Sequence, residues 1–146
     1  MNVRGKQLMI AYNAYNQYRE NSINTASPEE LTLMLYNGLV KFIMRGIDSI
    51  EKEKLDDAHN NIIKAQNIIT EFMNTLDGKY EISHSLMSIY DYMFRRLVEA
   101  NTSKDKKLLE EVLGYAKELR DIWEQAMKLS RRETKQKTKT ADTASV

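Results

Sequence analysis

Two pairs of acidic and histidine side chains are the residues of this sequence best suited to chemistry. Asp56 precedes His59 by three positions, and Glu81 precedes His84 by three. On a helix this spacing places a carboxylate and an imidazole on one face, as in the Glu-x-x-His motifs of carboxylate-bridged metal enzymes. Each pair falls in the first turns of its own expected helix, and neighbouring helices run antiparallel, so the pairs lie on the order of 30 Å apart. We therefore expect no metal site, no cofactor and no enzyme, and interpret both histidines as solvated.

Other catalytic patterns are missing from the sequence. It has no cysteine, which excludes disulfides, thiolate nucleophiles and thiolate zinc sites. It also has no glycine-rich phosphate loop, Gly-x-Ser-x-Gly turn or His-Glu-x-x-His motif. Because no residues for hydrolytic or kinase chemistry are visible, binding is the expected type of function.

The composition is typical of one helical domain. The chain has 146 residues, of which 42% are hydrophobic and 29% charged, so it can build a core but is too polar for membrane insertion. One proline and five glycines are too few for the turns of a strand-rich protein. No secretory apolar stretch follows Arg4 and Lys6, so we expect a cytoplasmic protein.

Capping and breaking signals divide the chain into helices. The run Ser27-Pro28-Glu29-Glu30 is a capping box with proline in the first turn, which predicts that a helix begins at Pro28. Charged or glycine-containing breaks separate four expected helices, at residues 28–52, 55–77, 81–101 and 105–129. Helices of this length with short connections pack as an antiparallel up-and-down four-helix bundle. The fold class is therefore all-α.

The bundle is expected to span residues 23–129, with a different segment at each end. Residues 1–22 carry Tyr12, Tyr15 and Tyr18 at intervals of three, which predicts an additional short helix. Residues 130–146 lack apolar periodicity and are expected to be a disordered basic tail.

The charge is unevenly divided. Six basic residues against two acidic ones give residues 128–146 a charge of +4, which leaves −3 for the rest of the chain. The bundle therefore has no strongly positive surface, and we expect no nucleic-acid partner for it. For the tail we favour a solvated segment, and the alternative is non-specific, salt-dependent contact with nucleic acid.

The apolar arcs of the expected helices are wider than a bundle needs. At about 100° per residue, helix 28–52 has an apolar arc of roughly 220° and helix 81–101 one of about 180°, whereas helix 55–77 has a narrow stripe. In one interpretation each wide arc simply lies between two neighbouring helices; in the other, which we favour, the excess binds helices of another chain. The predicted binding residues are Tyr36, Val40, Met44, Ile47, Met87, Phe94 and Val98.

Several segments together resemble the FliS family, the bacterial flagellin-specific secretion chaperones. These segments are Asn13–Tyr18, Asn24–Leu31, Leu35–Gly38, Asn61–Ile69 and Tyr90–Asn101. The resemblance covers roughly residues 13–127 in order and spacing. It has three departures. Ala14 stands where the family usually has proline, and several residues that include an extra Tyr12 precede the motif. Phe94 stands where the family commonly has tyrosine.

The resemblance implies a function for the chain. A protein of this family binds the disordered carboxy-terminal segment of flagellin in the cytoplasm, prevents its premature polymerisation and delivers it to the flagellar type III export gate. The family's paired amino-terminal tyrosines correspond to Tyr15 and Tyr18, which would contact the client or the gate. The alternative function is a helical-bundle interaction or regulatory module with another helical partner.

Overall fold

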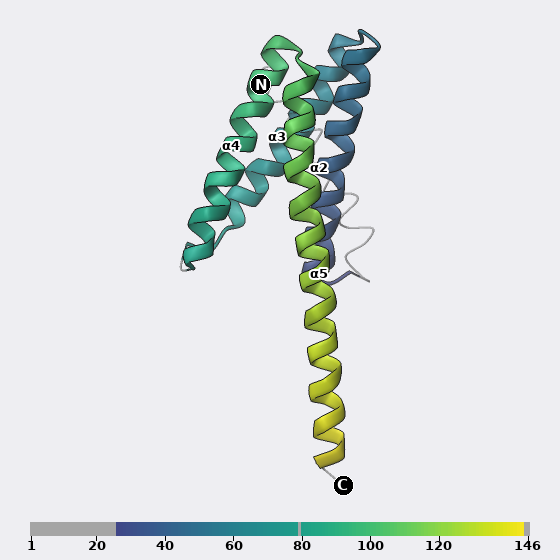
Figure 1. The fold of residues 1–146 in the computed structure, drawn as a ribbon, viewed down its shortest axis with the longest axis vertical. Coiled ribbons are helices and arrows are strands. Elements are labelled where there is room, and N and C mark those ends of the chain that lie inside the picture. The colour runs from purple at the N-terminus through teal and green to yellow at the C-terminus, as the bar shows by residue number, and fades with distance from the viewer. Residues whose placement is uncertain (1–25, 79, 145–146) are drawn as a thin grey trace, which may run out of the picture.

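The computed structural model describes residues 26–78 and 80–144, which form an all-α bundle of four helices (Figure 1). The helices are α2 (Pro28–Glu51), α3 (Leu55–Thr75), α4 (Glu81–Ser103) and α5 (Lys106–Ala144). Apart from the end of α5, every helix begins and ends within two residues of its predicted bounds. The predicted short helix within residues 1–22, with Tyr15 and Tyr18, lies outside the described residues.

The start of α2 shows why the sequence signal for this boundary was reliable. The Glu30 amide donates a hydrogen bond to Ser27 Oγ at 3.2 Å, and Pro28 occupies the first turn, where no amide partner is needed. Instead of completing the capping box, the Glu30 carboxylate accepts a hydrogen bond from Arg131 Nη2 at 2.7 Å. The amino terminus of α2 is therefore tied to α5.

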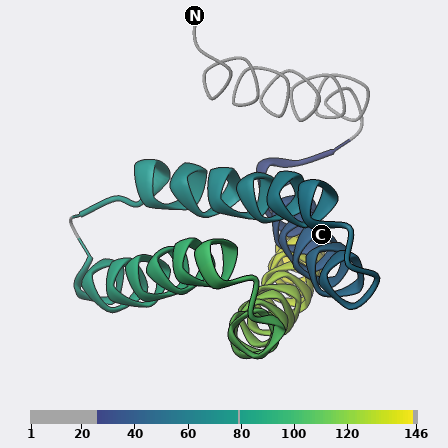
Figure 2. The ribbon, with the colours of Figure 1, turned by 90° about the horizontal axis from the view of Figure 1, so that it is seen from above.

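The helices pack in a ring in which α2 and α4 each contact both α3 and α5 (Figure 2). This arrangement confirms the bundle. The largest of its fully buried side chains are Leu39, Ile43, Ile62, Ile69, Met93, Leu97, Leu109 and Val112. Gly46 allows close packing at the centre, because a Cβ atom there would lie 3.3 Å from Leu109 Cδ1 and 3.5 Å from Ile62 Cγ1.

The bundle is not parallel-sided. Helix α4 is close to α5 near the α4 carboxy terminus and diverges from it toward Glu81 (Figures 1 and 2). Within the described residues, no helix is both long enough and apolar enough to cross a bilayer.

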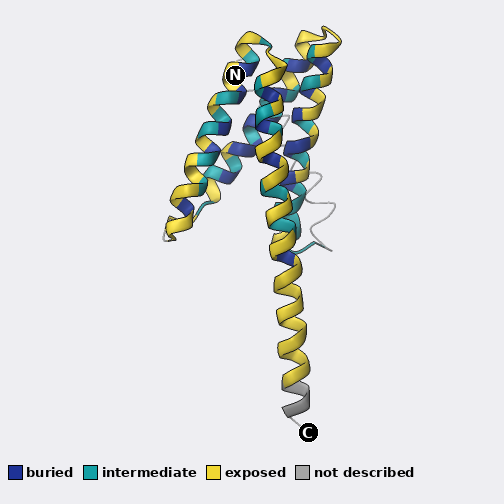
Figure 3. Ribbon diagram, viewed as in Figure 1, coloured by how far each residue is buried: buried dark blue, intermediate teal, exposed yellow. Residues whose placement is uncertain are grey.

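Helix α5 continues past the bundle to Ala144, where a disordered tail was expected after residue 129. Residues 128–140 are all exposed (Figure 3). No glycine or proline follows Gly114, and Lys, Arg, Glu and Gln are good helix formers. The hydroxyl groups of Thr134 and Thr138 each donate a hydrogen bond to the carbonyl four residues earlier, at 2.9 Å. Apolar periodicity indicates which face of a helix packs against other helices. Its absence shows that this segment does not pack, but not that the segment is non-helical.

Candidate protein-binding surface

Four aromatic side chains, one from each described helix, fill the core at the end where α4 and α5 diverge. The Tyr36 ring stacks on Phe72 with 4.4 Å between centroids, and Phe72 stacks on Tyr90 at 5.4 Å. Trp123 lies 6.5 Å from Tyr36, and its indole N–H donates a hydrogen bond to the Glu29 carbonyl at 3.0 Å. These large rings occupy the space between the helices, so the core continues although the helices spread apart.

A buried pair of hydroxyl groups lies within this aromatic cluster. The Tyr36 and Tyr90 hydroxyl oxygens are 2.7 Å apart, so one hydroxyl donates a hydrogen bond to the other across the bundle. Burial raises the pKa of Tyr36 and of Tyr90 above the ordinary value of 10.0, because the phenolate would lose its hydration. Both rings therefore stay neutral and serve the core.

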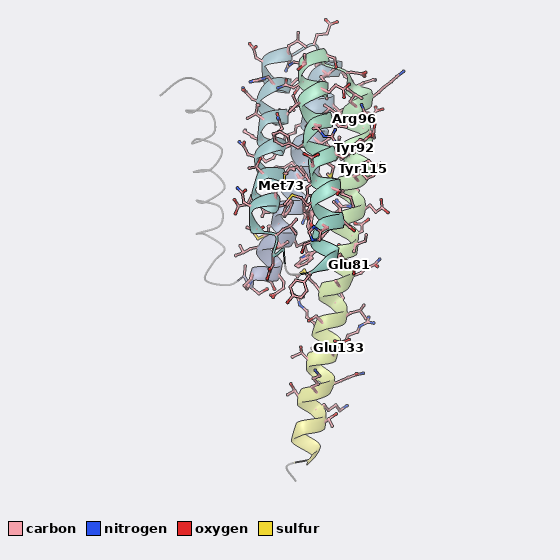
Figure 4. All side chains as sticks on the ribbon, turned by 90° about the vertical axis from the view of Figure 1, so that its left-hand side faces the viewer. Met73, Glu81, Tyr92, Arg96, Tyr115 and Glu133 are labelled. Carbon is pink, nitrogen blue, oxygen red and sulfur yellow. The ribbon has the colours of Figure 1, made fainter. Side chains whose placement is uncertain are left out.

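Charged and aromatic side chains join α4 to α5 where the two helices are still close together, next to the point at which they diverge. The Tyr92 hydroxyl donates a hydrogen bond to the Glu111 carboxylate, and Arg96 Nε donates one to the Tyr92 hydroxyl at 3.0 Å. Arg96 also pairs with Glu99 at 2.9 Å and with Glu111 at 3.6 Å, and the Tyr115 ring meets the Tyr92 ring edge-on at 5.9 Å. Figure 4 labels Tyr92, Arg96 and Tyr115 in this contact. The network fixes one end of the α4–α5 interface.

The hydrogen bonds of Arg96 further favour the charged form of a guanidinium that is already charged at physiological pH. The bond to Tyr92, followed by the bond to Glu99, raises the pKa of Arg96 above its ordinary value. The charge therefore persists throughout the physiological pH range.

Beyond this network the same two helix faces become apolar and are uncovered. Ile89 lies seven residues from Arg96 on α4, and Tyr115 lies four residues from Glu111 on α5, so each continues the face that meets the other helix. The residues of these faces, which we call the open apolar surface, are Ile82, Leu86, Ile89, Tyr115, Leu119 and Ile122.

Three members of the open apolar surface are strongly exposed. Ile82 is 67% exposed, Ile122 57% and Tyr115 39%, whereas Leu86, Ile89 and Leu119 are partly buried against the core. On each helix the residues follow an i, i+4, i+7 pattern, which matches the repeat of a helix packed alongside. A run of uncovered apolar side chains of this kind is suited to binding another apolar helix.

The residues predicted from sequence fall into three places. Tyr36 and Val40 are buried, each 5% exposed, and belong to the core. The wide arc of α2 is explained in part by its position between α3 and α5, which is the first of the two interpretations. Met44 is half exposed at the edge of the same helix, and Ile47 is partly buried against the core.

The predicted residues of α4 lie together on a different flank. Met87, Phe94 and Val98 are separated by seven and four residues, and Phe94 is about 200° around the helix from Tyr92, which faces α5. Met87 and Val98 are exposed, and Phe94 packs partly against the core. Since α2 and α4 lie across the ring from each other, the structure does not bring the predicted α2 and α4 residues into one surface.

The sequence prediction omits Ile82, Tyr115 and Ile122. Their i, i+4, i+7 spacing on each helix was a usable signal. Spacing alone could not show that α4 and α5 diverge, which is what leaves these side chains uncovered. A fully parallel bundle would bury the same residues.

The two acidic–histidine pairs do not form a metal site in the part of the chain that the structure describes, where no group of three or more potential ligands occurs. His84 is exposed, as expected. His59 is partly buried, and its Nδ1 atom lies 2.9 Å from Asn101 Nδ2, so this histidine links α3 to α4 instead of being fully solvated.

Comparison with known proteins places the chain in a family. Residues 11–130 match the family model described as "Flagellar protein FliS". The "Flagellar secretion chaperone FliS" of Bacillus subtilis (strain 168) is 48% identical over 125 residues, which is 86% of this chain and 94% of that protein. The "Flagellar secretion chaperone FliSB" of Pseudomonas aeruginosa is 34% identical over 122 residues, covering 80% of this chain and 97% of that protein.

A solved structure supports the fold. The "Crystal structure of flagellar chaperone from bacteria" aligns with a TM-score of 0.65 over 80% of this chain and 97% of that chain, at 19% identity. The resemblance noted in the sequence is confirmed by these matches, and the chain belongs to the FliS family of flagellar secretion chaperones.

Proposed function

We propose that this chain is a cytoplasmic export chaperone for flagellin. It binds the disordered carboxy-terminal segment of flagellin, prevents its premature polymerisation and delivers it to the flagellar type III export gate. Membership of the FliS family supports the chaperone role. The protein acts by binding and performs no catalysis.

The observation that carries this proposal is the open apolar surface. Ile82 and Ile122 expose more than half of their side chains at the end where α4 and α5 diverge. A flagellin segment that folds into a helix on this surface would place apolar anchors against them at i, i+3 and i+4 positions. Folding on binding buries about 1,000 to 3,000 Å² and loses several kcal/mol to ordering, so the complex is tight but reversible.

Other predicted residues complete the proposed interface. Met87, Phe94 and Val98 supply a second apolar contact on the opposite flank of α4, and Met44 and Ile47 a third on α2. A long client segment could follow these patches around the bundle in successive helical pieces. Tyr15 and Tyr18 are proposed to contact the client or the export gate. Tyr36 and Val40 are left out of this proposal because they are core residues.

Calorimetric titration with a peptide of the flagellin carboxy-terminal segment tests the proposal. Ile122→Asp should weaken binding at least tenfold, because a buried isoleucine contributes about 1.5–3 kcal/mol and each 1.4 kcal/mol is a factor of ten. Ile82→Asp should have a similar effect. Leu55→Asp is the matched control, since Leu55 is 52% exposed but lies at the start of α3, at the end of the bundle opposite to Ile82.

Circular dichroism of each variant separates loss of binding from loss of folding. Ile122 and Ile82 are exposed, so their replacement should leave the helical signal unchanged. Wild-type affinity in both folded variants would exclude the open apolar surface as the client site. No binding of the peptide by the unmodified protein would exclude flagellin as the client.

A further inference from the structure

The helical extension of α5 gathers its positive charges on one face. Five basic residues lie within about 100° of arc when α5 is followed at 100° per residue. They are Lys128, Arg131, Arg132, Lys135 and Lys139, which we call the basic stripe. The stripe covers about 16 Å of helix at 1.5 Å per residue, with one or two cations in each turn. As a disordered tail the same residues would have no common face.

The basic stripe is accessible along its length. All residues from Lys128 to Thr140 are exposed on a helix that projects beyond the bundle (Figure 3). The acidic residue within this span, Glu133, lies about 145° away from the centre of the stripe, on the projecting part labelled in Figure 4. Arg131 pairs with Glu30 and Lys128 with Glu124 at 3.8 Å, both at the end nearest the bundle.

The chemistry of the extension selects the kind of partner. From Ser130 to Thr140 there is no apolar side chain, so the helix cannot insert into a membrane interface or bind an apolar surface. Toward the bundle the same face carries Asp121 and Glu124, which would oppose a flat anionic bilayer lying along α5. The partner that remains is a narrow polyanion that the projecting helix can lie against.

We propose that the extension of α5 binds the phosphate backbone of nucleic acid without reading base sequence. A free helix fits the major groove of a duplex, which is about 12 Å wide, and Arg and Lys on one face pair with phosphates. The family model ends at residue 130, so most of the stripe lies beyond the matched region. The proposal concerns a partner separate from the flagellin client and does not depend on it.

Fluorescence anisotropy with the full chain tests this inference. The probes are a 20-base-pair DNA duplex, an RNA duplex of the same sequence and one of its single strands, titrated at several salt concentrations. At physiological salt the expected dissociation constant is about 10⁻⁴ to 10⁻⁶ M. For the DNA duplex, the slope of log K against log salt should lie between about −2.7, if three cations of the stripe bind phosphates, and about −4.5, if all five do.

A pair of charge-matched variants tests the role of the face. Lys135 lies within the stripe and Lys137 on the opposite side of the helix, and replacing either by glutamine removes one positive charge. Lys135→Gln should weaken binding about fivefold at 0.15 M salt and reduce the slope by about 0.9, since one fewer counterion is released. Lys137→Gln should change the affinity and the slope by no more than about half of the change that Lys135→Gln produces.

The results that would overturn the inference are distinct. Equal effects of Lys135→Gln and Lys137→Gln would show attraction by net charge without a binding face. Tighter binding to phosphatidylglycerol vesicles or to polyglutamate than to any of the nucleic acids would assign the stripe to a membrane or an acidic protein. Comparison of the DNA and RNA duplexes identifies which nucleic acid is preferred.

Discussion

Val40 and Met44 lie one turn apart on α2, yet the first is 5% exposed and the second 50%. Val40 faces the core, whereas Met44 is about 40° further round, at the exposed edge. A residue of an apolar arc can thus be buried in the core or be exposed and available to a partner. Its neighbours in space determine which of the two it is.

This difference predicts opposite results for the same substitution. Val40→Asp should reduce the free energy of unfolding by about 3 kcal/mol or more, because a charge would be buried without a partner. Met44→Asp should change it by less than about 0.5 kcal/mol. Urea unfolding followed by circular dichroism measures both. A stable Val40→Asp variant would mean that this part of the core opens readily to water.

The Tyr36–Tyr90 pair predicts a loss of stability in alkali. Each hydroxyl has a pKa raised above 10.0 in the folded protein, so the unfolded chain releases these protons first as the pH rises. Stability from this pair is complete below about pH 10 and falls as the pH rises above that value. The double variant Tyr36→Phe/Tyr90→Phe should show a shallower decline in urea-measured stability between about pH 9.5 and 11, the range in which an ordinary tyrosine ionises.

A decline of equal steepness in the double variant would assign alkaline unfolding to other groups. The control is Tyr80→Phe, because Tyr80 is exposed and its hydroxyl lies outside the core. It should leave the pH dependence unchanged.

Gly46 and Gly114, which both lie within helices, have different roles. A Cβ atom on Gly46 would meet Leu109 at 3.3 Å, so glycine there allows α2 to approach α5. A Cβ atom on Gly114 would meet nothing within 4 Å, so glycine there only weakens the helix.

We therefore expect Gly114→Ala to stabilise the protein and Gly46→Ala to do so less or not at all. Alanine is favoured over glycine by about 0.8–1 kcal/mol in a helix interior, and Gly114→Ala should gain this amount. In Gly46→Ala the gain is offset because the Leu109 side chain has to move. Thermal unfolding of the two variants gives the order, and the reverse order would contradict the packing at Gly46.

The extension of α5 should be the least stable helical part of the described chain. Residues 132–140 are all exposed, and an isolated helix shorter than about 12–15 residues is marginal in water. Amide hydrogen exchange should show little protection for residues 132–144 and strong protection for residues 109–116, which contain buried side chains of the same helix. Equal protection in both parts would contradict this prediction and would indicate that the extension is covered.

The sequence predicted those features of the fold that depend on residues close together in the chain. The start at Pro28 depends on Ser27 and its near neighbours, and the break after α3 on Asp77-Gly78, so both were found within two residues. The arrangement as a bundle followed because the helices are long and their connections short.

The open apolar surface was harder to predict because it depends on the angle between two helices. That angle is set by contacts between residues distant in sequence, such as Tyr92 with Glu111 and Tyr36 with Tyr90. The width of an apolar arc gives the number of apolar side chains but not their neighbours, so it did not distinguish Tyr36 and Val40, which are buried, from exposed residues such as Ile122. The helical extension was missed for a related reason, since it forms without packing.

Trp123 is the single tryptophan of the chain, and it lies beside Ile122 while packing against Tyr36 from the core side. Its indole is therefore an intrinsic fluorophore at the boundary between the protein interior and the uncovered residues of α5. A helix that binds to these uncovered residues would displace water from the Trp123 ring and shift its fluorescence emission to shorter wavelength. Binding of a helix beside Trp123 can thus be followed by the protein's own tryptophan fluorescence, without an attached dye.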